Sequence, residues 1–278
     1  MEQNNKQKWS LALVSLPVII WTLIPVIWIF SLAVKPQANQ ADNNFWPRGF
    51  SLDNFELILF GGASDLFLPA LLNSIIVGLI ATTISVILAT FCAYAIARLN
   101  FSGKKMILFV ALAVSFFPVI SLVTPLFDVW RSIGLFDTIP GLVIPYLSLT
   151  LPLSIWILSA FFQQIPWELE QAAQVDGATS WQAFRKVIVP LAAPGVFTTG
   201  IITFFTAWND FVFAISLTSE SARTVPAALA FFTGASQFEQ PTGAISAAAV
   251  IVTIPVVILV LLFQKRIVAG LTSGAVKG

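Results

Sequence analysis

The chain has 278 residues, of which 58% are hydrophobic and only 10% are charged, with a mean hydropathy of +0.90. An average soluble domain carries about 25% charged residues, so a soluble chain of this composition would expose a large apolar surface to water. The formal net charge of +1 excludes a general nucleic-acid binder, which would show a basic excess. The absence of histidine and the single cysteine exclude Ser-His triads, imidazole metal sites and disulfides within the chain. The composition is that of a membrane protein.

Six long tracts of the sequence contain no charged residue. They are residues 9–34, 66–97, 106–127, 138–167, 187–209 and 240–264. A helix needs about 20 apolar residues to cross a hydrocarbon core roughly 30 Å thick, and each tract meets that length. The strands of a porin-like barrel would instead alternate in segments of about 10 residues. The sequence therefore predicts an all-α membrane protein with six transmembrane helices.

The first tract, 9–34, follows Lys6 and Lys8 and so resembles the start of a secretory signal peptide. The apolar region of a signal peptide spans only about 7–15 residues, and this tract is much longer. We therefore expect a retained transmembrane helix.

The basic residues predict the orientation of these helices. With the N-terminus inside the cell, ten of the fourteen basic residues fall on the cytoplasmic side. The four on the outer side are Lys35, Arg48, Arg131 and Arg223. This asymmetry follows the positive-inside rule and predicts that both termini are cytoplasmic.

The longest cytoplasmic connection, 166–190, predicts two short helices joined by a bend. Gly177 can end the first helix in a left-handed conformation, and Thr179 or Ser180 can cap the second. Apolar residues recur in the second helix at spacings of three and four, as in an amphipathic helix. They are Trp181, Phe184 and Ile188. A capped interfacial elbow without a further role explains this pattern alone equally well.

The order of residues in this connection resembles the EAA coupling loop of ABC importer permeases, most closely that of the carbohydrate branch with the maltose permease. The matching residues are Glu170, Gln171, Ala172, Ala173, Asp176, Gly177, Ala178, Phe184, Pro190 and Leu191. In the family this loop docks on the ATPase. The family glutamate before the two alanines is replaced by Gln171, which cannot form an ion pair. The resemblance therefore implies Glu170 as the acidic partner of the ATPase.

The resemblance covers nearly the whole chain. It includes the segments 73–74, 92–98, 103–104, 208–211 and 270–278. The stretch 207–278 also resembles the second permease of actinobacterial trehalose importers. The family implies a type I ABC importer permease fold, with one transmembrane permease domain over 1–278, a coupling loop at 166–190 and a cytoplasmic tail at 265–278. It also implies a multi-pass protein of the bacterial cytoplasmic (inner) membrane.

The sequence has no phosphate-binding P-loop. Gly103-Lys104-Lys105 lacks the preceding glycine and the following hydroxyl residue of that motif. We expect a non-catalytic chain that binds no cofactor, with ATP and Mg held by a separate ATPase dimer. The family implies further partners: a second homologous permease, an extracytoplasmic sugar-binding protein and the lipid bilayer, but no nucleic acid. The expected function is half of an alternating-access path for a disaccharide such as trehalose or maltose.

Four residues are candidates for the substrate path. They are Asn73, Trp208, Asn209 and Asp210. Ionisable groups in membrane helices usually face a bundle interior or a water-filled cavity. Asp210 and Asn209 can therefore bind sugar hydroxyls while Trp208 or a nearby phenylalanine stacks on the apolar face of the sugar. Hydrogen bonding to another helix, or a place at the headgroup level, is a slightly stronger interpretation of the pair, and helix contact is also favoured for Asn73.

Two further sets of residues are implied by the resemblance alone. Phe231, Phe232 and Thr233 are candidates for contact with the binding protein, with a re-entrant packing element as an equal alternative. Ser273 and Lys277 are candidates for a tail contact with the ATPase, with a frayed end as the alternative.

A different class of function is a stand-alone ion- or proton-coupled secondary carrier for a small polar solute. Such carriers often show internal repeats and broken helices with buried charges. This sequence shows no obvious repeat and only Asp210 at depth in a span. An intramembrane enzyme has still less support, since no clustered nucleophile and base are present.

Overall fold

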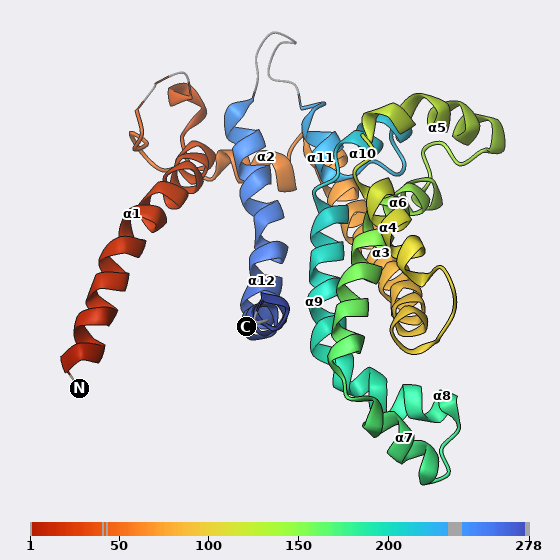
Figure 1. Ribbon diagram of the computed structural model, residues 1–278. Helices are drawn as coiled ribbons and strands as arrows, with labels where there is room; N and C mark the ends of the chain where they lie inside the picture. The colour runs from red at the N-terminus through yellow and green to blue at the C-terminus, as the bar shows by residue number, and fades with distance from the viewer. Residues whose placement is uncertain (1, 41, 43, 233–240, 276–278) are drawn as a thin grey trace. The chain divides into compact units, whose positions relative to one another are not determined.

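The computed structural model describes residues 2–275 except for 41, 43 and 233–240. All regular elements in this part of the chain are helices (Figure 1). The chain forms two compact units. Unit 1 comprises Met1–Leu68 and Leu229–Pro255, and unit 2 comprises Pro69–Ala228 and Val256–Gly278. Helices α3 (Ser64–Arg98) and α12 (Thr242–Ala275) have residues in both units.

Five stretches of helix in the described residues are long and apolar enough to cross a membrane. They are Ser15–Ala33, Ser64–Arg98, Ile139–Gln164, Ser180–Trp208 and Thr242–Gln264. The first belongs to α1 (Glu2–Ala33), the third is α6 (Ile139–Gln164), and the fourth ends with α9 (Val189–Trp208). These spans confirm five of the six predicted from the uncharged tracts.

The third uncharged tract does not form one straight helix. It divides into α4 (Lys104–Ser115) and α5 (Ile120–Ile133), which meet at an angle of 90°. Pro118 lies in the break; it has no backbone N–H and disfavours helical geometry at the residue before it. With 12 residues, α4 is only about 18 Å long. The expected six spans are therefore present only if this bent pair counts as one.

Unit 2 is built around the close packing of α6 against α9. Gly195 of α9 allows this approach, because a Cβ atom there would lie 2.4 Å from the ring of Phe161. Nearby, the hydroxyls of Ser154 and Thr203 share a buried hydrogen bond of 2.9 Å. Two groups of buried apolar side chains surround this pair of helices, one of them including Tyr146 and the other Phe184.

Short helices complete both units. In unit 1 these are the 3-10 turn η1 (Gln37–Asn39) and α2 (Asp53–Leu59). In unit 2 they are α7 (Trp167–Val175), α8 (Ser180–Ala183), the π-helical turn η2 (Phe184–Ile188), α10 (Val212–Leu217) and α11, which runs Val225–Leu229 and ends at the unit boundary.

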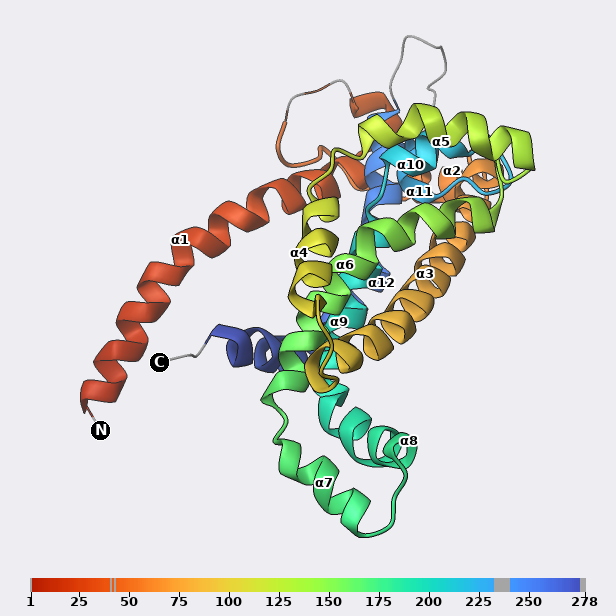
Figure 2. The same ribbon diagram turned by 45° about the vertical axis from the view of Figure 1, so that its right-hand side comes forward.

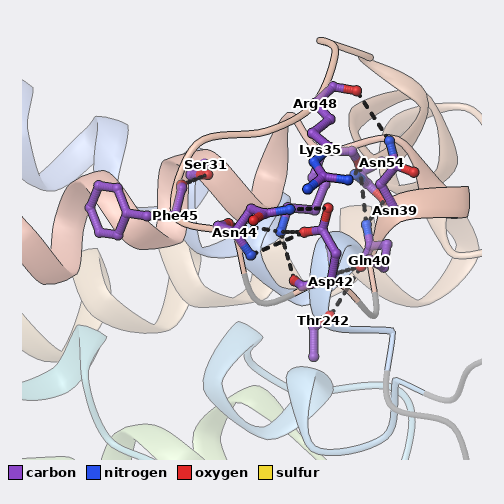
Figure 3. Close-up of polar contacts among 11 residues, drawn as sticks. Ser31, Lys35, Asn39, Gln40, Asp42, Asn44, Phe45, Arg48, Asn54 and Thr242 are labelled. Carbon is purple, nitrogen blue, oxygen red and sulfur yellow. Dashed lines mark hydrogen bonds and ion pairs between the residues drawn. The ribbon is translucent and has the colours of Figure 1, made fainter.

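The connection after α1 is organised by a buried lysine (Figure 3). Lys35 is fully buried, and its Nζ donates to Asp42 Oδ1 at 2.6 Å and to the carbonyl oxygens of Asp42 and Asn44 at 3.0 and 3.2 Å. Hydrogen bonds from Lys35 and Asn44 hold the pKa of Asp42 below its ordinary value. The ammonium group thus closes this polar segment and satisfies carbonyls that no helix satisfies.

A second contact joins the same connection to the start of α12 within unit 1. Gln40 Oε1 accepts hydrogen bonds from Gly243 N at 2.7 Å and from Thr242 Oγ1 at 3.0 Å. Asn54 of α2 donates to the carbonyl oxygens of Ala33 and Lys35, each at 2.9 Å. In this connection, hydrogen bonds from polar side chains therefore hold backbone groups that lie outside regular helices.

Candidate functional site

The connection between α6 and α9 forms the predicted pair of helices. Helix α7 ends before Gly177, which has a φ of +89°, and α8 begins after Thr179. Thr179 is the capping residue: its Oγ1 accepts from Gln182 N at 3.2 Å, and its own N–H donates to Gln182 Oε1 at 2.9 Å. Figure 2 shows α7 and α8 projecting together beyond the ends of α6 and α9. We call this projection, residues 166–183, the elbow.

Glu170 of the elbow points into unit 2. Its side chain is buried, at 2% exposure, and Tyr94 Oη of α3 donates to its Oε1 at 2.5 Å. Arg98 Nε lies 3.5 Å from Glu170 Oε2. The carboxylate is therefore already engaged by α3 in this structure. The expected pairing of Glu170 with an ATPase stays a prediction, and it would require these contacts to rearrange.

Arg98 contacts the first helix of the elbow at two points and Ile165, the residue just before the elbow, at a third. Besides Glu170, its Nη2 donates to the carbonyl oxygen of Ile165 at 2.8 Å, and its guanidinium lies 5.2 Å from the ring centroid of Trp167. Neither Tyr94 nor Arg98 was assigned a role from the sequence, although both lie in the segment 92–98 that carries the family resemblance. The available signal in the sequence was an arginine directly after the uncharged tract 66–97, on the side of the membrane predicted to be cytoplasmic.

The remaining coupling candidates lie at the surface of the elbow. Gln171, Ala172, Asp176 and Gly177 are exposed, and Ala173 is half-buried. Val175 at the end of α7 is 86% exposed, which is unusual for an apolar side chain. This surface is available to a partner, whereas Glu170 is not.

Asn73 binds the chain itself. Its Nδ2 donates to the carbonyl oxygens of Ser221 and Arg223 at 2.9 and 3.0 Å, and the neighbouring Ser74 Oγ accepts from Val225 N at 2.8 Å. The start of α3 in unit 2 thus holds the segment between α10 and α11. This geometry favours the packing interpretation of Asn73 over a substrate contact.

The three adjacent candidates at the end of α9 also make contacts within the chain. Trp208 is buried and stacks on Phe204 with 5.2 Å between ring centroids. Asn209 donates to the carbonyl oxygen of Phe205 at 2.8 Å, one helical turn back, and remains exposed. Asp210 Oδ2 accepts from Ala214 N at 3.1 Å and so caps α10.

Asp210 has a second neighbour, the buried Tyr146 of α6, with which it interacts electrostatically. Thr224 also lies near Tyr146, so polar groups of α6, of the end of α9 and of the segment before α11 come close together. The half-buried Asp210 therefore has contacts within the chain, chief among them the hydrogen bond from Ala214 N.

Asp137 is a polar residue of this region that sequence reasoning missed. Its carboxylate accepts hydrogen bonds at 2.9–3.2 Å from the backbone N–H groups of four consecutive residues and at 2.8 Å from Ser219 Oγ. The four are Ser219, Glu220, Ser221 and Ala222. Partial burial raises the pKa of Asp137, but these donors outweigh it and lower the pKa well below the ordinary value. Asp137 has a φ of +56°, and no local sequence pattern predicts this pairing with residues more than 80 positions away.

The other candidates lie partly outside the described residues. Phe231 is 46% exposed, and Phe232 meets Phe67 edge to face within unit 1 at 6.5 Å between centroids. Thr233, Lys277 and the side chain of Ser273 lie outside the description. Among the described residues, no group of three or more acidic or cysteine side chains could hold a metal ion.

The sequence and the fold match known transport proteins. Residues 85–273 match the family model described as binding-protein-dependent transport system inner membrane component. The trehalose transport system permease protein SugB of Mycobacterium tuberculosis is 56% identical over 94% of each chain. The trehalose/maltose transport system permease protein MalG of Thermococcus litoralis is 40% identical over 92% of each chain. The sulfoquinovosyl glycerol transport system permease protein SmoH of Agrobacterium fabrum is also 40% identical, over 92% of this chain and 89% of that protein.

Among solved structures, a bacterial ABC transporter that imports the acidic polysaccharide alginate has a chain with a TM-score of 0.75. The match covers 95% of this chain and 98% of that chain at 22% identity, so it shows the shared fold alone. A second structure, of a bacterial alginate ABC transporter in complex with a pentasaccharide-bound periplasmic protein, matches with a TM-score of 0.68 at 19% identity.

Proposed function

The chain belongs to the family of binding-protein-dependent transport system inner membrane components, and we propose that it forms half of the membrane path of an ATP-driven disaccharide importer. Trehalose is the first candidate substrate. The observation that carries this choice is the 56% identity to a trehalose permease over 94% of both chains. A relative that is named for sulfoquinovosyl glycerol is only 40% identical. No observation favours the alternative of a stand-alone secondary carrier.

We propose that the elbow is the contact for an ATPase dimer, which holds ATP and Mg while this chain binds neither. The exposed apolar Val175 and the exposed Gln171 and Asp176 form a surface suited to such a contact. The elbow is tied to α3 through Glu170 and continues without a break into α9 through η2. A displacement of the elbow by ATPase closure would therefore move two membrane-spanning helices together, as alternating access requires.

The proposal includes a second homologous permease and an external sugar-binding protein. In this proposal the elbow and both termini lie on the cytoplasmic side, because most basic residues then lie on that side as well. Phe231, Phe232 and Thr233 then lie on the outer side as candidates for the binding protein, and Ser273 and Lys277 on the inner side as candidates for the ATPase. The partly exposed Phe231 is compatible with an external contact.

Reconstitution tests this function. The chain is co-expressed and purified with its second permease and ATPase and is reconstituted into vesicles that enclose ATP. Uptake of radiolabelled trehalose is then measured with the binding protein outside. We expect uptake that needs both ATP and the binding protein. Uptake by this chain alone under an ion gradient would refute the proposal, whereas ATP-dependent uptake of another sugar would refute only the choice of trehalose.

A further inference from the structure

A groove of about 360 Å³ lies in unit 2 between α3, the α8–η2 segment and α9. Val86 and Ile87 of α3 form one wall, and Val189 and Val196 of α9 form the other. Val189 and Val196 lie seven positions apart, which is about 10 Å along the helix axis. Both walls belong to helices that are apolar enough to span a membrane. The groove therefore has apolar walls formed by two membrane-spanning helices.

One end of the groove carries a positive charge and an indole ring. Arg185 is exposed, is the one charged residue that lines the groove, and makes no ion pair with a described residue. Trp181 is 57% exposed and stacks on Phe91 with 6.2 Å between ring centroids. Arginine and tryptophan at the end of a membrane span are typical of the lipid headgroup level. Since Arg185 precedes α9, this end is the cytoplasmic one in the predicted topology.

We propose that this groove binds one anionic phospholipid of the cytoplasmic leaflet. Arg185 binds the phosphate, since a guanidinium group matches phosphate oxygens in charge and in geometry. An acyl chain lies between the valine walls of α3 and α9. The inference does not depend on the transported sugar, and it needs only the inner-side position of Arg185.

Charge and shape together favour a lipid over a protein helix as the occupant. At the headgroup level Arg185 meets lipid phosphates directly, whereas a partner helix would have to supply a carboxylate at this one position. A helix is also about 10–12 Å across with its side chains and packs on a broad face rather than in a groove of about 360 Å³. A phospholipid provides the anion and the thin apolar chain in one molecule.

The chain offers a matched control for the test. Lys186 is exposed, neighbours Arg185 and does not line the groove, so Lys186→Gln removes the same charge beside the groove. Arg185→Gln removes the charge in the groove. Val196→Phe keeps Arg185 and fills the apolar part of the groove.

Native mass spectrometry of the purified transporter complex measures the binding of added phosphatidylglycerol, with phosphatidylcholine as the neutral comparison. We expect the complex to bind phosphatidylglycerol preferentially, and Arg185→Gln to weaken that binding by about fivefold, the factor for one basic residue near an anionic membrane surface. Val196→Phe should weaken the binding of both lipids at this site, and Lys186→Gln should leave it unchanged.

Three results would overturn the proposal. Equal losses in Arg185→Gln and Lys186→Gln would show a general effect of surface charge. Unchanged lipid binding in Arg185→Gln and Val196→Phe would show that the groove is not a lipid site. Loss of co-purified subunits in Val196→Phe, with lipid binding retained, would assign the groove to a protein partner.

Discussion

The hydroxyl of Tyr94 donates a 2.5 Å hydrogen bond to the buried carboxylate of Glu170, joining α3 to the elbow across 76 positions of sequence. Arg98 provides the positive charge on the other side of the same carboxylate. A buried carboxylate needs such partners because desolvation of a charge is costly. This contact makes Glu170 a structural part of the elbow and leaves Gln171 at the surface.

Removing one partner of this contact should damage coupling. Tyr94→Phe deletes a hydrogen bond to a charged group and should cost about 1.5–3 kcal/mol of stability. Glu170→Ala leaves Arg98 without its carboxylate in a buried place and should cost about 3–5 kcal/mol. In reconstituted complexes we expect less sugar transported per ATP hydrolysed with Tyr94→Phe.

Gln171→Ala is the control for the stability measurement alone, since Gln171 is exposed on the same helix and also belongs to the proposed ATPase contact. It should leave the stability of the chain unchanged, as measured by thermal unfolding in detergent. Full coupling and unchanged stability in Tyr94→Phe would contradict a transmitting role for the contact.

Asp210 should behave as a structural residue. Asp210→Ala removes the acceptor for Ala214 N and should cost on the order of 1 kcal/mol, the scale of a lost helix cap. Asp210→Asn retains an acceptor oxygen and should restore most of the stability. We expect uptake to fall with Asp210→Ala and to recover with Asp210→Asn, with the KM for sugar unchanged in both. A raised KM in a stable Asp210→Asn protein would instead indicate direct contact with the sugar.

Asp137 should stabilise the segment Ser219–Ala222 at every pH near neutrality. Its pKa is lowered in the folded chain, so its contribution is complete above the unfolded value of about 4 and is lost only as the pH falls toward the lower folded value. Asp137→Asn should cost on the order of 1 kcal/mol, because this partly exposed carboxylate is screened by solvent. Thermal unfolding of the two proteins between pH 5 and pH 8, values above the ordinary pKa of about 4, should show a constant difference. A difference that disappears within this window would contradict the assignment.

Two glycines of α9 should respond in opposite ways to alanine. A Cβ at Gly195 would lie 2.4 Å from the Phe161 ring, whereas a Cβ at Gly200 would meet its nearest neighbour at 3.8 Å. Gly195→Ala should therefore destabilise unit 2 by about 1–3 kcal/mol through overpacking. Gly200→Ala should be neutral or stabilising by up to about 1 kcal/mol through higher helix propensity. Thermal unfolding of both variants measures the contrast, and equal effects would refute the close packing of α6 on α9.

The long spans and the caps of the elbow were determined by the sequence itself. An uncharged tract reports the local cost of placing charge in hydrocarbon, so five tracts predicted their helices without knowledge of the packing. Gly177 ends α7 through its own backbone conformation, and Thr179 caps α8 through a residue three positions away, so the sequence predicted both roles. Pro118 carried a local signal for the break between α4 and α5, which the prediction, based on the length of the uncharged tract alone, did not use.

Only the tertiary structure decided where the polar side chains point. In the sequence, nothing distinguishes Glu170 from an exposed acid that docks a partner, or Asp210 from an acid that binds a substrate. Their partners, Tyr94 and Tyr146, lie on other helices, and Asp137 binds a segment more than 80 positions away. Such pairs depend on how the helices pack, because a buried polar group takes whichever partner the packing brings within hydrogen-bond distance.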